Sequence, residues 1–150
     1  MSKSEQQVLL VGSQQKITVE HWQRLACIYV RQSSPKQVLH NLGSQYNQYG
    51  LADRAADLGW KRERIWIIDT DQGVSGNGRA ERDGFEELVT AVSLNQVGII
   101  FGYEVARLAR NNREWYHLLD LAAVFGTLIA DIDGIYDPRL YNDRLLLGLK

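Results

Sequence analysis

Four short apolar runs constrain the fold of this chain more than any other feature. They lie within 25–30, 63–70, 97–103 and 127–132, and isoleucine, valine and aromatic residues are frequent in them. Such residues favour strands, and continuous apolar runs of this length are typical of strands buried on both faces. The sequence therefore predicts a sheet built from short, buried strands.

The segments between these runs have the apolar spacing of helices. Gly59 and Gly126 stand where the first and third of these segments end, as expected of glycines that close helices. Strand and helix thus alternate, which predicts an α/β fold with a mostly parallel sheet of four to five strands and helices on both faces. The predicted helices lie within 35–60, 81–96 and 112–126.

The 150 residues suffice for one ordinary domain. We expect the polar, mixed residues 1–23 to form an N-terminal extension and residues 24–140 to form the folded domain. Residues 141–150 are expected to start a C-terminal helix that the chain end truncates. The Asn142-Asp143 pair is typical of the cap that begins such a helix.

Targeting and membrane signals are not apparent in the sequence. A cationic and then apolar leader is missing, as is any apolar run near ~18 residues, so we expect a cytoplasmic protein without a membrane partner. The single cysteine, Cys27, cannot form an internal disulfide. Because it lies in an apolar run, we expect it to pack as a small buried hydrophobe.

Opposite charges nearly balance in this chain. Lys and Arg total 17 and Asp and Glu total 18, so the net charge of −1 gives no general attraction to polyanions. A contact with nucleic acid would then depend on a local patch or on sequence outside this chain. No Cys/His cluster has metal-ligand spacing, so we expect no metal and no other cofactor, and we expect His21, His40 and His117 to pack or to lie at the surface.

Arginines, a serine and a carboxylate follow the predicted strands at the points where the strands end. Because the carboxyl ends of parallel strands share one edge of a sheet, these side chains can meet in one pocket. Guanidinium groups bind phosphate oxygens and stabilise the charge of a phosphoryl-transfer transition state. A serine beside them can attack phosphorus when a carboxylate or water accepts its proton. The residues are Arg31, Ser33, Asp71, Arg107 and Arg110, together with Arg82 from the far side of the glycine-rich loop that follows the second strand.

The same residues also have purely structural explanations. Arg107 and Arg110 are three apart, a spacing common on solvated helix faces. Arg31 can pair with Asp69 or Asp71 next to it in the sheet. Ser33 is followed closely by a proline and can belong to a turn. Likewise, Tyr29 and Trp22 are expected to pack in the core or at its edge.

Taken together, these residues resemble the serine recombinases, the resolvase and invertase family, over about residues 24 to 150. The family signature Tyr-x-Arg-x-Ser at the end of the first strand is matched by Tyr29, Arg31 and Ser33. The later family motifs are a helix Gln, an acidic residue before a Gly-x-Ser-Gly loop, an Arg after that loop, and an Arg-Leu-x-Arg pair. They are matched in order by Gln45, Asp71, Ser75, Arg82, Arg107 and Arg110.

The resemblance implies the catalytic domain of a site-specific DNA recombinase. Ser33 would attack a DNA phosphodiester and form a 5′-phosphoserine link, while the arginines stabilise the charge at phosphorus. Because the link conserves the energy of the broken bond, rejoining would need neither a metal nor ATP. The substrate would also contact Gln45, Ser75 and Tyr29, and the protein would act as a homodimer that associates into a tetramer.

The sequence departs from the family pattern at two places. The family usually has an Asp immediately before the Arg-Leu-x-Arg pair, where this chain has Ala106, and Glu104 is the nearest carboxylate. The match of Asp71 can also shift by one position to Gln72. A non-catalytic dimerisation or DNA-associated module is therefore the alternative function. A flavodoxin-like ligand binder is disfavoured because the segment after the first strand, RQSSPKQ, has no glycine for a phosphate loop.

Overall fold

The computed structural model describes residues 16–30, 42–69, 78–103, 109 and 111–150, with the backbone alone at 42–49 and 78–83. Its centre is a five-stranded sheet in the order β2-β1-β3-β4-β5. The first four strands are mutually parallel and β5 runs antiparallel to β4. This confirms the predicted fold class. The strands are β1 (Leu25–Tyr29), β2 (Ile65–Ile68), β3 (Val97–Gly102), β4 (Leu128–Ala130) and β5 (Ile135–Tyr136).

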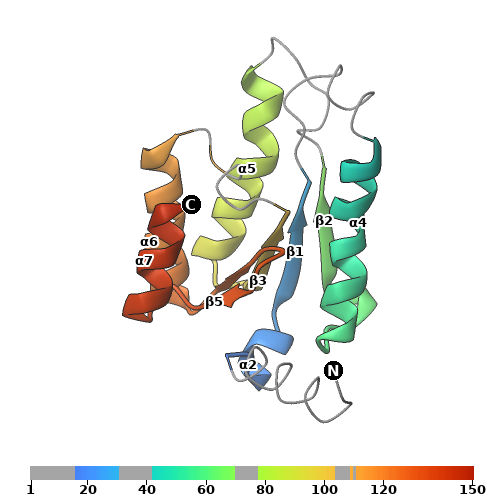
Figure 1. Cartoon of the computed structure of the whole chain (residues 1–150), viewed down its shortest axis with the longest axis horizontal. Helices are drawn as coiled ribbons and strands as arrows, with labels where there is room; N and C mark the ends of the chain where they lie inside the picture. Colours follow the sequence, from blue (N-terminus) through green and yellow to red (C-terminus); the bar gives the residue numbers. More distant parts are fainter. Residues whose placement is uncertain (1–15, 31–41, 70–77, 104–108, 110) are drawn as a thin grey trace.

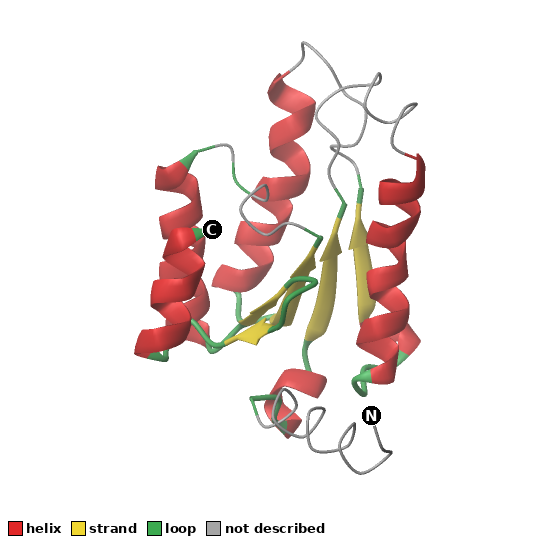
Figure 2. Ribbon diagram, viewed as in Figure 1, coloured by secondary structure: helices red, strands yellow, loops and turns green. Residues whose placement is uncertain are grey.

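Helices cover both faces of the sheet, with α4 on one side and α5, α6 and α7 on the other (Figures 1 and 2). Side-chain direction alternates along β1, so that Ala26 and Ile28 face α4 whereas Cys27 and Tyr29 face α5 and α6. Each face therefore has its own apolar core. The helices are α2 (Val19–Trp22), α4 (Leu42–Asp57), the 3-10 turn η1 (Arg62–Arg64), α5 (Gly78–Ser93), α6 (Asn112–Phe125) and α7 (Tyr141–Leu149).

The ends of the helices confirm two sequence predictions and contradict a third. Gly126 closes α6 in the left-handed conformation (φ 69°), and Gly59 follows α4 with φ 120°. The predicted Asn142-Asp143 cap is wrong, because α7 begins after Leu140 without a side-chain cap. Asp143 instead accepts the Asp137 N–H at 2.9 Å, which ties α7 to the segment after β5.

Residues 16–23, which we expected to belong to an extension, pack against the amino end of the sheet. Ile17 and His21 are 6% and 2% exposed. The Trp22 ring lies edge-on to Trp60, with 6.4 Å between ring centroids, as expected of a packing residue. The proposed domain boundaries stay predictions.

Cys27 is completely buried in the middle of β1. Burial raises the pKa of its thiol to about 12 because the thiolate would lose its hydration. The cysteine is thus a core residue, as predicted. Among the helices that the structure describes, none is long and apolar enough to cross a membrane.

Candidate active site

Three parallel strands end level with one another at the carboxyl edge of the sheet. β1 lies between β2 and β3, and its last residue, Tyr29, is in register with Ile68 of β2 and with Gly102 of β3. One further backbone hydrogen bond, from Val30 N–H to the Ile68 carbonyl at 2.9 Å, continues the pairing past Tyr29. The chain therefore leaves all three strands from neighbouring points, as the sequence predicted.

Helices begin on this same side, because β1, β2 and β3 are each followed by a helix that runs back along the sheet (Figure 1). The unpaired N–H groups of a helix N-terminus carry partial positive charge and favour anions. At α6 one of these donors is already satisfied, since the Asn111 side chain accepts the Glu114 N–H at 2.9 Å. The edge is therefore electrostatically suited to a phosphate.

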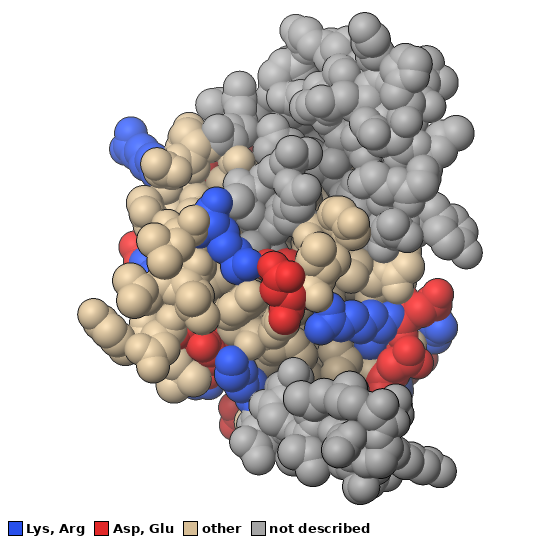
Figure 3. Space-filling model, in the orientation of Figure 1, with Lys and Arg blue, Asp and Glu red and all other residues tan. Residues whose placement is uncertain are grey.

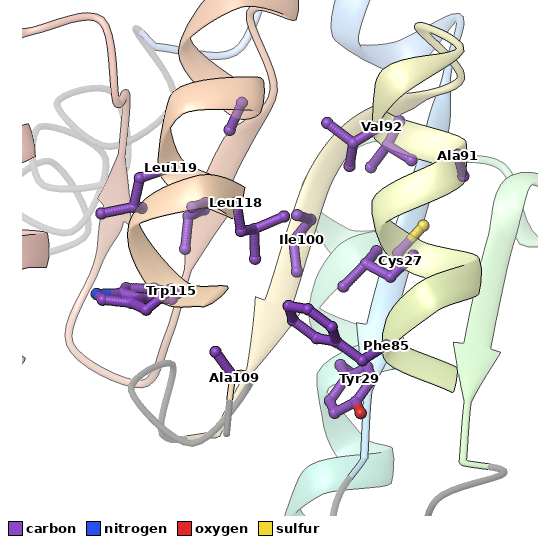
Figure 4. Close-up of a cluster of buried hydrophobic side chains, with 14 of the residues drawn as sticks. Cys27, Tyr29, Phe85, Ala91, Val92, Ile100, Ala109, Trp115, Leu118 and Leu119 are labelled. Carbon is purple, nitrogen blue, oxygen red and sulfur yellow. The ribbon is translucent and has the colours of Figure 1, made fainter. Parts of the chain in front are cut away.

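A compact apolar layer supports this edge from below. Tyr29, Phe85 and Ala109 are 2%, 9% and 7% exposed and belong to one core cluster. Figure 4 shows all three at the same end of that cluster. Ala109 stands directly before Arg110 in the sequence, so the core anchors the chain next to that arginine. The packing prediction for Tyr29 is confirmed.

The sequence-predicted site residues are distributed unevenly over the described structure. Gln45 and Arg82 lie in the first and second turns of α4 and α5, the helices that start at the carboxyl edge, but their side chains are not described. Tyr29 is in the core beneath. The remaining residues of the predicted site lie outside the described residues, as do Glu104 and Ala106; they are Arg31, Ser33, Asp71, Ser75, Arg107 and Arg110.

Comparison with known proteins identifies the family. The sequence-family model of the resolvase N-terminal domain matches residues 26–150, which is most of the chain. The chain belongs to this family. The uncharacterized protein y4bA/y4pH of Sinorhizobium fredii is 53% identical to it over 135 residues, which cover 90% of the chain and 20% of that relative. This resolvase domain thus spans about a fifth of the length of that relative.

Solved structures agree with this architecture. The crystal structure of the N-terminal catalytic domain of TP901-1 integrase superimposes on the resolvase domain with a TM-score of 0.54 and 19% sequence identity. The match covers 84% of this chain and 90% of the other. At this identity the likeness concerns the fold.

Both signs of charge occur on the described surface in the view of Figure 3. Figure 3 shows basic and acidic side chains interleaved among neutral ones on the face in view. Within the described ranges, no group of three or more His, Cys, Asp or Glu side chains could hold a metal ion. His21 is buried and His117 is exposed, as expected of packing and surface histidines, and His40 lies outside the described residues.

Sequence reasoning missed two residues that organise the resolvase domain. The Asn111 cap had a local signal, since Asn followed three positions later by Glu is typical of a helix start. Arg24 had none. Its guanidinium donates to the Val97 and Phe125 carbonyls at 2.9 and 3.0 Å, and these acceptors are 73 and 101 positions away in sequence.

Proposed function

We propose that this resolvase domain is the catalytic domain of a site-specific DNA recombinase with Ser33 as the nucleophile. The observation that carries the proposal is the level, adjacent ending of β1, β2 and β3 in a chain of the resolvase family. Arg31 and Ser33 follow Tyr29 by two and four residues, so an extended chain keeps them within about 7 and 14 Å of its Cα atom. The catalytic groups therefore belong at this edge.

In the proposed reaction the Ser33 Oγ attacks a DNA phosphorus and its proton passes to a carboxylate, with Asp71 as the candidate, or to water. The bond from phosphorus to the 3′ oxygen breaks, and that oxygen leaves as a hydroxyl after it takes up a proton. The products are a 5′-phosphoserine link and a free 3′ end. After strand exchange, the 3′ hydroxyl of another strand attacks the link, which restores the phosphodiester and releases Ser33.

Four arginines are proposed to stabilise the pentacoordinate phosphorus. Its equatorial oxygens carry more negative charge than those of the ground state, and guanidinium forks match their geometry. Bond energy is retained in the phosphoserine link, so the cycle needs no ATP and no metal. The arginines are Arg31, Arg82, Arg107 and Arg110.

The remaining site residues are proposed to orient the DNA or the arginines. Gln45 and Ser75 supply hydrogen-bonding groups near the helix starts of this edge. Tyr29 is 2% exposed, which favours support of the Arg31 segment from below over extensive contact with DNA.

Self-association and DNA binding complete the proposal. An exposed apolar stripe on α7 supports a homodimer that pairs into a tetramer, because Tyr141, Leu145 and Leu149 are 81%, 53% and 77% exposed at helical spacing.

The net charge of −1 suggests that much of the DNA affinity resides elsewhere in the protein. The cytoplasmic location expected from the sequence is part of this proposal.

A covalent trapping experiment tests the nucleophile. The protein that carries this domain is incubated with its nicked recombination site, and the denatured mixture is resolved on a gel. We expect a protein–DNA adduct in the wild type and in the matched control Ser34→Ala, and none in Ser33→Ala. An adduct that persists in Ser33→Ala would rule out Ser33 as the attacking group.

Ala106 favours a second candidate function, in which the domain is a non-catalytic module for dimerisation or DNA association. The family usually has Asp at this position, and its loss removes a carboxylate that could orient an arginine. Wild-type protein that binds the nicked site without ever forming the adduct would support this module.

A further inference from the structure

A groove beside β2 lies away from the proposed catalytic edge. Its volume is about 690 Å³, and its apolar floor is formed by Leu25, Trp66 and Ala91. Trp66 is only partly buried although it packs against the core. An open groove with a partly exposed tryptophan is typical of a contact surface, since aromatic side chains contribute strongly to binding.

The strand that borders the groove is at the end of the sheet. β2 pairs with β1 on one side, and no strand among the described residues pairs with its other side. The Ile68 carbonyl points to β1, where it accepts the Val30 N–H. Backbone direction alternates along a strand, so the N–H and C=O of Ile67 point to the outer side.

β2 has little of the protection that edge strands usually carry. All four of its residues, IWII, are apolar, and Ile67 is 37% exposed. Natural edge strands are commonly protected by charged residues or proline within the strand. An apolar edge with outward backbone donors and acceptors is suited to the addition of another strand.

The uncommitted charge around the groove is negative. Glu86 and Glu87 line its α5 side, both are exposed, and neither forms an ion pair within the described part of the chain. Arg24 and Arg64 line a neighbouring pocket and not this groove, and they donate to backbone carbonyls and not to these carboxylates. Arg64 donates to the Trp22 carbonyl at 2.8 Å, and Arg24 is bound to several carbonyl groups.

We propose that this groove binds an extended, cationic segment of a partner protein, which adds to β2 as a strand. The outward backbone groups of Ile67 pair with the segment, and its aliphatic side chains cover Trp66. Its Lys or Arg side chains pair with Glu86 and Glu87. DNA is not a suitable occupant, because two unpaired carboxylates repel phosphates. The inference is independent of the phosphoryl-transfer chemistry proposed at Ser33.

A peptide titration of the 150-residue chain tests the proposal. The probe is an eight-residue peptide in which valine and lysine alternate, and the control peptide alternates valine and glutamate. We expect saturable shifts of the Ile65 and Ile67 amide resonances with the lysine peptide and at least tenfold weaker binding of the glutamate peptide. Equal affinity for both peptides, or no saturable shift at β2, would overturn the proposal.

Two glutamine variants test the contribution of the carboxylates to the contact. Glu86→Gln and Glu87→Gln should each weaken binding of the lysine peptide about 2- to 5-fold, the range for exposed ion pairs. Asp57→Asn, an exposed carboxylate on α4, is the matched control and should leave it unchanged. Unchanged binding in both glutamine variants would contradict the cationic occupant.

Ile67→Pro removes the outward N–H without removing a bond to β1. We expect binding about 5-fold weaker, as for the loss of one hydrogen bond, provided that circular dichroism shows a folded variant. Unchanged binding in a folded Ile67→Pro would overturn strand addition. Amide shifts at β2 that follow the protein's own concentration and not the peptide would assign the groove to a second copy and also overturn the proposal.

Discussion

The two edges of the parallel sheet have opposite backbone polarity. At the carboxyl edge β1, β2 and β3 end together and helices begin, so backbone donors point outward. At the amino edge the helices end, and their unpaired carbonyl groups face residues 16–24. The repeated strand–helix pattern thus produces one edge that attracts anions and one whose helix carbonyl groups need hydrogen-bond donors.

Side-chain donors close the amino edge. Arg24 alone donates to Asn95 Oδ1 and to the carbonyls of Val97 and Phe125, all within 3.1 Å. Trp60 Nε1 donates to the His21 carbonyl at 3.1 Å, and Trp22 Nε1 to that of Leu58 at 3.0 Å. These side-chain donors stabilise the amino edge, which lies opposite the edge of the proposed chemistry.

The largest expected effect is on activity at the carboxyl edge. Arg107→Ala should lower the rate of adduct formation about 10³-fold, as is typical when a preorganised donor to a transition state is removed. The urea midpoint should stay within the error of the wild type, because the proposal assigns this arginine to the DNA phosphate and not to the packing of the domain. A large loss of stability with an unchanged rate would reverse the assigned roles of the two edges.

The next effect is on stability at the amino edge. Arg24→Ala should lower the free energy of unfolding by about 3 kcal/mol, because it leaves several buried carbonyls without a charged donor. Equilibrium urea unfolding measures it. The control Arg62→Ala removes an ion pair with Asp53 whose side chains are 67% and 72% exposed, and it should cost less than about 1 kcal/mol. Equal losses in both variants would contradict the special role of Arg24.

A steric change at the amino edge should have a smaller effect. A Cβ atom at Gly98 of β3 would overlap the His21 carbonyl oxygen, so α2 would have to shift from the sheet. Gly98→Ala should therefore cost about 2 kcal/mol, within the range for overpacked sites. Hydrogen exchange should show faster opening of residues 17–24 than in the wild type. The exposed Gly50→Ala in α4, which has no neighbour within contact distance, should not destabilise.

The smallest effect is a pH dependence at the same edge. His21 Nδ1 accepts the Thr18 N–H at 2.9 Å and Nε2 donates to the Gly126 carbonyl at 2.8 Å, so the ring is neutral. Burial lowers the pKa of His21 below its ordinary 6.5, and the cations of Arg24 and Arg139 lower it further. The hydrogen bond to the Gly126 carbonyl and the charge of Asp137 raise this pKa, but they do not outweigh the other effects.

The direction of the pH effect follows from proton binding. Between the lowered pKa of folded His21 and about 6.5 the unfolded chain binds more protons, so the free energy of unfolding falls as the pH falls through this window. Urea titrations at several pH values from 7.5 to 5 should show this slope in the wild type and a flatter one in His21→Gln. Identical slopes would show that His21 titrates alike in both states.

Most of the architecture was predictable because its signals are local. The apolar run at 97–103 corresponds to β3, which ends one residue earlier, at Gly102. The helix expected at 112–126 ends at Phe125, directly before the predicted Gly126. Runs of apolar residues, amphipathic spacing and terminal glycines each depend on neighbours within a turn or a strand. The position of the candidate site followed from them, because parallel strands must end at one edge.

The sequence by itself determined the alternation of strands and helices, the family motif from Tyr29 to Ser33, and the edge at which that motif must lie. Only the tertiary structure decided the pairing of the two-residue β5 with β4, the docking of α2, and the roles of Arg24 and Asp143. The physical reason is the range of the interactions. Local propensity and periodicity are encoded by adjacent residues, whereas a buried carbonyl finds its donor only after distant segments have packed together.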